Sequence, residues 1–178
     1  MTEKITINGK RVYEGKVTAI DKNSVKIILS NGNTGVLYVE DISNNYINPY
    51  FLFDLDAKLF VGIKQRCFDG TLILTLKGIV SKNISDFSRC EEMYGIVVAT
   101  CDKGSIIQIT TWLTAFISNV FLEKGTVVLA SICKTDRVSN RILMLLDSIV
   151  YDDYSNVKLN INYGDIQVIE ETELEIAA

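Results

Sequence analysis

The sequence predicts an all-β protein made of two tandem five-stranded Greek-key barrels, the second one degenerate, followed by a C-terminal β-hairpin. The first observation is a repeat: the segment Glu14–Ile20 returns eighty positions later as Tyr94–Thr100. The second is that apolar and polar residues alternate in short runs, as in half-buried strands. The third is that turn-forming dipeptides such as Asn8-Gly9 separate these runs. A repeat of this length indicates two copies of one small β unit.

Length and composition allow two small domains. The chain has 178 residues and 48% apolar content, and domains of roughly 60–80 residues can fold, although with a modest core. We divide the chain into an N-terminal barrel with a leading hairpin (1–78), a connection (79–93), a degenerate barrel (94–150), and a C-terminal hairpin with an acidic tail (151–178).

The first unit begins with two predicted hairpins. Asn8-Gly9 lies between the alternating segments 5–7 and 11–13, and this dipeptide supplies the positive φ angles of a two-residue turn. Apolar residues then occupy every second position in 17–19 and 25–29, with Asp21–Ser24 as the turn. A strand that leads into a second hairpin is the expected start of a small barrel.

Three further strands complete the first unit. Residues 35–40 predict the third strand, and the chain's single proline, Pro49, excludes regular structure in the loop that follows. Residues 58–64 and 71–77 predict a last hairpin, joined across Asp69-Gly70. Five short strands at this spacing are typical of a small Greek-key barrel.

The second unit is predicted from Gly95 to about Ile149 and is shorter in its middle, so we expect its third strand and the loop there to be reduced or replaced. Residues 111–121 fill that gap, and their apolar positions fit a short helix as well as a strand. Beyond them, 157–161 and 166–169 alternate and predict a final hairpin that pairs with an open barrel edge. The acidic residues that close the chain are expected to be solvated.

The residue inventory argues against an enzyme and against a metal or cofactor site. The chain has no histidine, its four cysteines lie more than ten residues apart, and no glycine-rich phosphate loop is present. Asp152-Asp153 are adjacent, so on a strand they point to opposite faces. We therefore expect no catalytic residues, no metal and no cofactor.

Charge and hydropathy restrict the partner and the compartment. The net charge of −4 argues against a surface that is basic overall, so that nucleic acid could bind only at a local basic strip. The N-terminus lacks the apolar core of a signal peptide, and no apolar run approaches about 18 residues. We expect a cytoplasmic protein with no membrane contact and with reduced, mostly buried thiols. Abundant Asn, Lys and Ile with scarce Pro indicate an AT-rich bacterial source.

Motifs in residues 12–78 resemble the RNA-binding domain named after ribosomal protein S-one, which is a five-stranded OB-fold barrel. The matching segments are Gly15-Lys16-Val17, Val25–Leu29, Gly35–Ile42 and Leu72–Lys77. They are similar to the family's opening G-x-V, its G-x-F-V-x-L strand, its G-L-x-H-x-S strand and its closing L-S-L-K. Residues 94–149 resemble the family more weakly, because the middle strand's pattern is missing there.

Several positions that bind RNA in the family carry other residues in this chain. The family's stacking Phe falls at Lys26 in the first unit and at Ile106 in the second. Its third-strand His falls at Tyr38, which can still stack on a base, and its third-strand Ser falls at Glu40, whose charge repels a phosphate. The resemblance therefore implies weakened RNA binding.

These considerations give two hypotheses for function. The first is a non-catalytic protein that binds single-stranded nucleic acid, preferably RNA, weakly and with little sequence preference through the first barrel. Its site would place Tyr38 under a base and basic side chains on phosphates, namely Lys26, Lys64, Arg66 and Lys77. The alternative is an OB-fold protein-interaction or assembly module that has lost RNA binding.

Four aromatic residues are ambiguous in the sequence. Phe60 is out of step with the apolar positions of its strand, so it is either a second stacking platform or, as we favour, a contact with the other barrel. Trp112, Phe116 and Phe121 lie in a strongly apolar run, and we interpret them as core residues rather than the lining of a groove.

Overall fold

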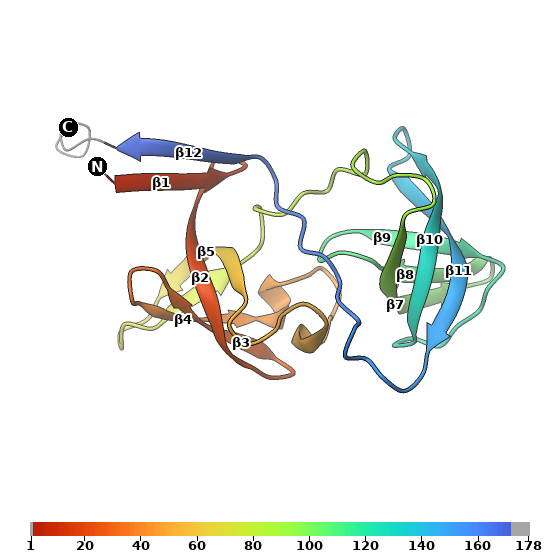
Figure 1. Cartoon of the computed structure of the whole chain (residues 1–178), viewed down its shortest axis with the longest axis horizontal. Coiled ribbons are helices and arrows are strands. Elements are labelled where there is room, and N and C mark those ends of the chain that lie inside the picture. Colours follow the sequence, from red (N-terminus) through yellow and green to blue (C-terminus); the bar gives the residue numbers. More distant parts are fainter. Residues whose placement is uncertain (1, 172–178) are drawn as a thin grey trace. The chain divides into compact units, whose positions relative to one another are not determined.

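The computed structural model describes residues 2–171 and consists almost entirely of β-strands (Figure 1). The chain divides into two compact units. Unit 1 contains the described residues up to Ser81 together with those from Asn162 onward, and unit 2 is Lys82–Ile161.

Unit 1 contains a closed five-stranded barrel. Its strands are β2 (Lys10–Ile20), β3 (Ser24–Leu29), β4 (Thr34–Tyr38), β5 (Lys58–Arg66) and β6 (Leu72–Thr75). They are hydrogen-bonded in the order β2-β3-β4-β6-β5, and β5 pairs back with β2 to close the ring. Every pair is antiparallel except β4 with β6. This order is that of the OB-fold, a five-stranded Greek-key barrel.

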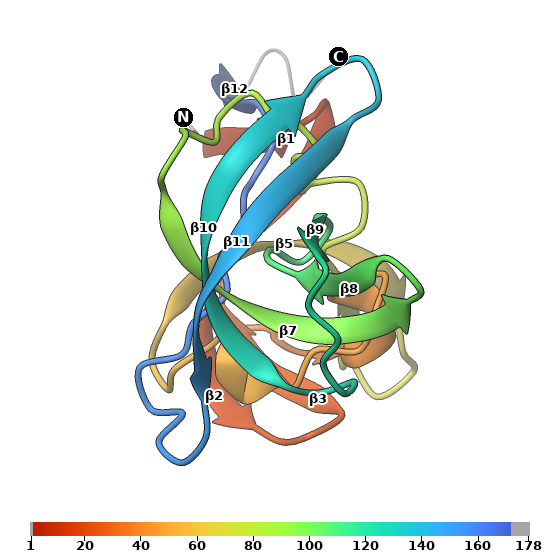
Figure 2. The same cartoon turned by 90° about the vertical axis from the view of Figure 1, so that its right-hand side faces the viewer.

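Unit 2 repeats the same topology. Its strands are β7 (Glu92–Cys101), β8 (Gly104–Gln108), β9 (Thr114–Ser118), β10 (Val127–Asp136) and β11 (Arg141–Val150). They form a closed barrel in the order β7-β8-β9-β11-β10, again with one parallel pair, β9 with β11. Figure 2 shows β10 and β11 paired along most of their length. The prediction of tandem five-stranded OB-type barrels is confirmed.

The repeat seen in the sequence is a repeat in space. The first strand of each barrel has an irregularity in its pairing at the same place, after Val17 and after Val97. Gly15 and Gly95 are equivalent as well. A Cβ there would lie 2.5 Å from the Cγ2 atom of Ile27 in unit 1, and 2.8 Å from the Cδ1 atom of Ile107 in unit 2. A side chain at either position would push against this isoleucine of the neighbouring strand, so glycine fits both positions.

The third strand of unit 2 and its loop were expected to be reduced or replaced; this was wrong for the strand, which is present, and right for the loop, which is shorter. β9 is a strand, and it pairs with β8 in the register that β4 has with β3: Phe116 lies opposite Ile106 as Val36 lies opposite Lys26. The unit is shorter only after this strand. Residues 39–57 connect β4 to β5, whereas the shorter segment 119–126 connects β9 to β10.

The long connection in unit 1 contains two 3-10 helices, η1 (Val39–Asp41) and η2 (Pro49–Phe51). The strand predicted for 35–40 therefore ends at Tyr38. Asn48 caps η2 by accepting a hydrogen bond from the backbone N–H of Tyr50 at 3.2 Å, and Pro49 occupies the first turn, where no N–H is needed. This connection carries two tyrosines of the candidate site, Tyr46 and Tyr50.

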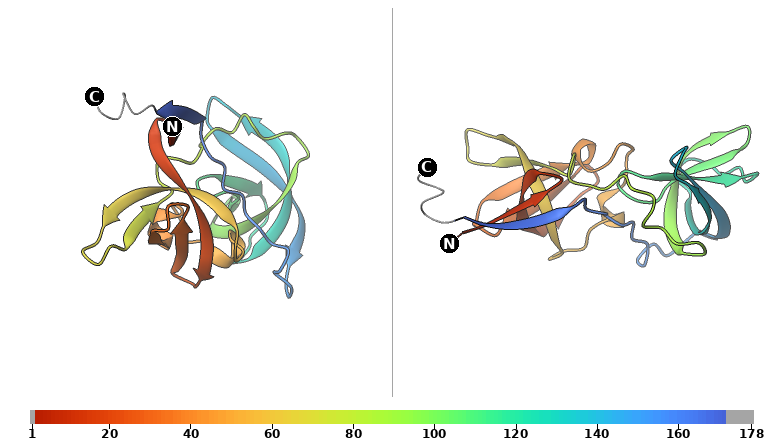
Figure 3. Two further views of the ribbon diagram at one scale, coloured as in Figure 1. Left: turned by 60° about the vertical axis from the view of Figure 1, so that its left-hand side comes forward. Right: turned by 90° about the horizontal axis from the view of Figure 1, so that it is seen from above.

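The two ends of the described chain pair with each other. β1 (Thr2–Ile7) forms the predicted hairpin with β2 through Asn8-Gly9, whose φ angles are 51° and 76°. Its other edge pairs with β12 (Ile166–Glu171), and the two strands run side by side in Figure 3. The expected C-terminal hairpin is thus replaced: 157–161 is not a strand, although Val157 and Leu159 are buried, and β12 pairs with β1 instead.

Each barrel has its own apolar core. In unit 1 the inward residues of the strands are buried, including Val17, Ile27, Leu37, Val61 and Leu74. In unit 2 the core includes Val97, Ile107, Ile117, Val128 and Met144. The thiols, expected to be mostly buried, are exposed at Cys90 and Cys101 and half-buried at Cys67 and Cys133. Within residues 2–171, no helix has the length and apolar character needed to span a membrane.

Candidate functional site

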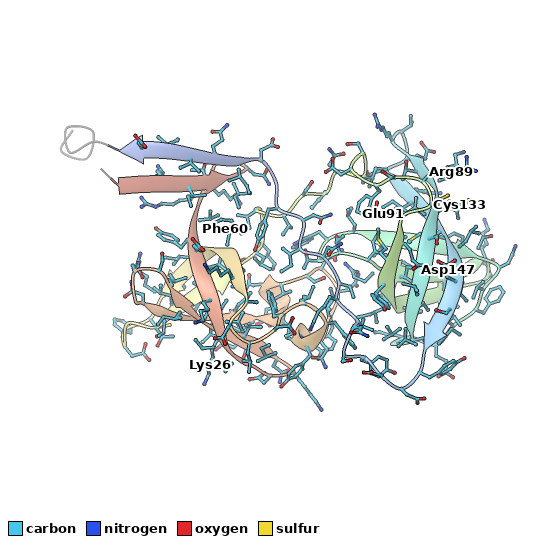
Figure 4. The ribbon with its side chains drawn as sticks, in the orientation of Figure 1. Lys26, Phe60, Arg89, Glu91, Cys133 and Asp147 are labelled. Carbon is cyan, nitrogen blue, oxygen red and sulfur yellow. The ribbon has the colours of Figure 1, made fainter. Side chains whose placement is uncertain are left out.

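The outward face of β3 and β4 in unit 1 presents Lys26 and Tyr38, as predicted from the sequence. Side chains on β3 alternate between the core and the surface, and Lys26 is an exposed position (Figure 4). On β4, Leu37 is buried while Tyr38 is 38% exposed. Tyr38 pairs with Ser24 and Lys26 with Val36, so the two side chains are diagonal neighbours on one face of adjacent strands.

Two further tyrosines gather around the turn between β2 and β3. The Tyr46 hydroxyl donates to the carbonyl oxygen of Lys22 at 2.9 Å, and the Tyr50 hydroxyl donates to the carbonyl oxygen of Ile20 at 2.8 Å. The two residues remain 57% and 52% exposed. With Tyr38, whose partner Ser24 ends the same turn, they form what we call the tyrosine cluster: Tyr38, Tyr46 and Tyr50.

Tyr46 and Tyr50 were not predicted as site residues from the sequence. Both lie in the irregular loop after the third strand, where no periodicity shows which way a side chain points. The available signal was local, because the asparagines beside the two tyrosines, Asn44, Asn45 and Asn48, are typical of exposed turns. Their hydroxyl bonds to the turn, which link residues 24 and 30 positions apart, are tertiary contacts.

The turn that supports the cluster is held by Asp21. Its carboxylate accepts hydrogen bonds from the backbone N–H groups of Asn23 at 2.7 Å and Ser24 at 2.9 Å, and from the Ser24 hydroxyl at 3.1 Å. These bonds, that from Asn23 foremost, hold the pKa of Asp21 below its usual value. The turn is therefore ordered by its own residues, and it presents the exposed Lys22 at its tip.

Two of the other predicted cations form an ion-pair network inside unit 1. The carboxylate of Asp41, only 2% exposed, accepts hydrogen bonds from the Lys64 ammonium at 2.9 Å and the Thr75 hydroxyl at 3.0 Å. The Lys77 ammonium lies 4.0 Å from the same carboxylate. Lys64 and Lys77 are thus brought together, but around a buried acid, Asp41, that was not predicted as a site residue.

Arg66 is set apart from the other predicted site residues. Arg66 is the last residue of β5 and pairs with Leu72 of β6. Leu72 in turn pairs with Gly35 at the start of β4, whereas Tyr38 is at the end of β4. A rise of about 3.3 Å per residue places the two side chains toward opposite ends of the barrel wall. Arg66 is exposed, but it does not belong to the surface that Tyr38 and Lys26 share.

Phe60 is covered by a residue of its own unit. Its ring meets that of Tyr163 edge-on, with centroids 5.6 Å apart and an interplanar angle of 80°. The Tyr163 hydroxyl accepts from the Phe60 N–H at 2.9 Å and donates to the Phe60 carbonyl oxygen at 3.2 Å, and burial raises the pKa of Tyr163. Phe60 therefore fastens the segment before β12 to the barrel and is not a stacking platform.

The three aromatics of 111–121 in unit 2 do not all lie in the core, contrary to our expectation. Trp112 is half-buried, with the Lys82 ammonium 5.2 Å from its ring centroid. Phe121 is exposed, and Phe116 is half-buried and lines a cavity. Phe116 is on the outward side of β9, because its neighbours Ala115 and Ile117 take the inward positions.

Carboxylates of unit 2 approach each other on the outer side of β7, β10 and β11. Glu92 pairs in register with Ser131, whose hydroxyl donates to the Asp147 carboxylate, and Asp147 is labelled in Figure 4. A hydrogen bond with Asp147 is the main cause that raises the pKa of Glu92. In the part of the chain that the structure describes, no group of three or more Cys, Asp or Glu side chains is arranged to hold a metal ion.

The fold and the sites define a tandem OB-fold protein, and comparisons with known proteins add no family to this. No protein-family model and no curated protein matches the sequence. One similar solved structure is the intact alpha subunit of aIF2 from Pyrococcus abyssi, at 12% identity and a TM-score of 0.37, with 40% of this chain and 29% of that chain covered.

Two other solved structures are similar to this chain at the same sequence identity and at TM-scores close to that value. The a/eIF2alpha-aDim2p-rRNA complex from Pyrococcus horikoshii OT3 matches at 12% identity and a TM-score of 0.37, covering 40% of this chain and 45% of that chain. A multidomain protein with nucleic acid binding domains from Streptococcus pneumoniae TIGR4 matches at 12% identity and a TM-score of 0.35, covering 82% of this chain and 54% of that chain. The chain thus spans less than two thirds of each.

Proposed function

We propose that this chain is a non-catalytic protein that binds single-stranded nucleic acid, with RNA preferred, at the tyrosine cluster of unit 1. The observation that carries the proposal is the convergence of Tyr38, Tyr46 and Tyr50, all exposed, around one ordered turn of an OB barrel. OB-folds bind single strands by stacking bases on exposed aromatic rings along a groove that carries positive charge.

The residues of the cluster suit this mechanism because their rings are held in place before a ligand arrives. The hydroxyls of Tyr46 and Tyr50 are bonded to the turn, so little side-chain entropy is lost when a base stacks on either ring. Each stacked base contributes about 1–3 kcal/mol, and every base has a face that can stack. Binding is therefore expected to tolerate many sequences.

The cations of the proposed site differ from those expected. Lys26 and Lys22 are exposed beside the cluster and are assigned to phosphates. Lys64 and Lys77 are assigned first to Asp41, and their remaining contribution is to the positive potential around it. Arg66 is too far along the barrel to share a base with Tyr38. The preference for RNA rests on the resemblance of residues 12–78 to the S-one RNA-binding domain.

A second candidate function, a protein-interaction or assembly module, is favoured by a different surface. Among the described residues, β12 is the last strand of its sheet, and its second edge pairs with none of them. Its apolar residues Ile166, Val168 and Ile169 are exposed, and an exposed apolar edge strand is a ready template for pairing with another chain. The net charge of −4 also suits a protein partner better than a nucleic acid.

A titration separates the two functions. A fluorescein-labelled single-stranded RNA of about 12 nucleotides, within the range that OB-folds occupy, is titrated with the chain at low and high salt. We expect anisotropy to rise at low salt, affinity to fall with salt, and the RNA to stay intact on a denaturing gel. Tyr38→Ala should weaken binding, whereas the control Tyr151→Ala, an exposed tyrosine of unit 2, should not. Absence of binding at low salt would exclude the nucleic-acid proposal.

A further inference from the structure

Unit 2 carries two adjoining cavities on the outward side of β8, β9 and β11. They have volumes of about 410 Å³ and 350 Å³, and both are lined by Phe116, Arg141 and Ile142. The larger one is also lined by Lys103, Ile106 and Thr114, and the smaller one by Lys134 and Asp136. Sites for small ligands commonly measure about 300–1,000 Å³, so each cavity has the size of a ligand site.

The Phe116 ring forms the apolar centre of this surface. Phe116 is flanked in register by Ile106 on β8 and Leu143 on β11, and all three are half-buried. Gly104 makes room for the ring: a Cβ there would lie 3.0 Å from the Cζ atom of Phe116 and would overlap the carbonyl oxygen of Ile117. The ring is thus held at a fixed place between two strands while part of it stays open to solvent.

Cationic side chains surround this apolar centre. Lys103 comes from the turn between β7 and β8, and Lys134 and Arg141 come from the two strands of the β10–β11 hairpin. The carboxylate among the lining residues, Asp136, accepts hydrogen bonds from the backbone N–H groups of Val138 at 3.0 Å and Ser139 at 3.4 Å. These bonds hold the carboxylate in its charged form, and it offsets one of the three cations, so the lining carries a net positive charge although the whole chain is acidic.

We infer that unit 2 holds a nucleotide in these cavities, with the base against Phe116 and the phosphate on Arg141, assisted by Lys103 or Lys134. An aromatic face next to a guanidinium matches a planar base joined to a phosphate, because the guanidinium can bind two phosphate oxygens at once. Asp136 balances only one of the three cations in the lining, so a purely apolar ligand would leave two of them without a countercharge there. The nucleotide can be free or part of a single strand.

This site differs from the positions expected from the sequence. The family resemblance places a stacking residue at position 106, which is Ile, and residue 116 was interpreted as core. The inference extends the proposed function to unit 2, but it shares no residue with the tyrosine cluster. Unit 2 can therefore be tested by itself within the full chain.

The test is an NMR titration of the isotope-labelled full chain, first with AMP and then with an RNA of about four nucleotides. We expect shifts of the backbone amides of Ile106, Thr114 and Phe116 that saturate. Phe116→Leu, which keeps an apolar side chain of similar volume, and Arg141→Gln should each weaken binding at least about tenfold. The matched control Arg137→Gln, in the same hairpin but outside the cavity linings, should leave affinity unchanged.

The two ligands and one additional variant separate the possible outcomes. Saturation by AMP identifies a free nucleotide as sufficient, and saturation by the RNA alone identifies a strand as the source of the nucleotide. Tyr38→Ala should leave the shifts in unit 2 unchanged. If neither ligand shifts the amides of unit 2, or if Arg137→Gln weakens binding as much as Arg141→Gln, the inference is overturned. RNA-induced shifts confined to the tyrosine cluster would overturn it while supporting the proposed function.

Discussion

The Lys64 ammonium donates a 2.9 Å hydrogen bond to the carboxylate of Asp41, which is almost completely buried at the end of the unit 1 barrel. A buried carboxylate that loses a partner keeps its desolvation cost without the compensating interaction. This pair gives Lys64 a structural contact in addition to the ligand contact that the sequence suggested, and we propose that the structural contact is its main role.

Lys64→Gln is expected to destabilise unit 1 by about 1–2 kcal/mol, since Thr75 and Lys77 remain beside Asp41 and Lys64 is half exposed. RNA affinity should change little. Lys26→Gln is the matched control, for which we expect unchanged stability and weaker RNA binding. Hydrogen exchange of unit 1 amides measures stability, and anisotropy measures affinity. The structural role of Lys64 is contradicted if Lys64→Gln leaves the stability of unit 1 unchanged and weakens RNA binding more than Lys26→Gln does.

Tyr46→Phe removes the hydroxyl that binds the Lys22 carbonyl oxygen but keeps the ring. We expect faster hydrogen exchange in the turn between β2 and β3 and a loss of stability of about 0.5–1.5 kcal/mol. Tyr46→Ala should weaken RNA binding more than Tyr46→Phe does, because it also removes the ring on which a base can stack. Equal RNA affinities of Tyr46→Ala and the unmodified chain would show that this ring does not contact RNA.

The Glu92–Asp147 interaction predicts a pH dependence in unit 2. The pKa of Glu92 is raised above its usual 4.5, mainly by the hydrogen bond with Asp147, so the folded state binds the proton more tightly than the unfolded state does. This contribution to stability is complete below pH 4.5 and is lost as pH rises through the raised pKa. Glu92→Gln should therefore stabilise unit 2 at neutral pH and not in acid.

The fluorescence of Trp112, the single tryptophan of the chain and part of unit 2, measures this effect. Urea unfolding of the unmodified chain and of Glu92→Gln is compared below pH 4 and above pH 7. If Glu92→Gln changed the urea midpoint equally at both pH values, the pH dependence could not come from the raised pKa of Glu92.

Gly104→Ala tests the support of the Phe116 ring. An added methyl group would overlap the Ile117 carbonyl oxygen, and the φ angle of 156° is unfavourable for alanine. We expect a loss of more than about 1 kcal/mol and changed shifts at Phe116. The control is Gly125→Ala, at a φ of 92° with no atom within 4 Å of the added group. A smaller cost for Gly104→Ala than for the control would contradict this explanation.

The hairpins of both barrels could be predicted because their signals are local. Alternation fixes which residues of β3 face the core, and Asn8-Gly9 fixes the turn between β1 and β2. The pairing of β12 with β1 joins segments more than 150 residues apart, so no local pattern specifies it. The same holds for Tyr163, which lies 103 positions from the Phe60 it covers.

The candidate sites were only partly predictable, for the same physical reason. Lys26 and Tyr38 follow from strand alternation on a recognised motif. The burial of Asp41 and the bonds of Tyr46 to the turn depend on how a long connection folds back, which the sequence does not encode locally. Phe116 was misplaced because the apolar run around it conceals the alternation that points it outward.

The most direct measurement is the mapping of ultraviolet crosslinks between the full chain and a labelled single-stranded RNA by mass spectrometry, at low salt. Binding at the tyrosine cluster predicts crosslinked peptides that contain Tyr38, Tyr46 or Tyr50, and their loss in Tyr38→Ala or at high salt. Crosslinks confined to the β1–β12 ribbon, or no crosslink to residues 38–50 when RNA is bound, would contradict the proposal.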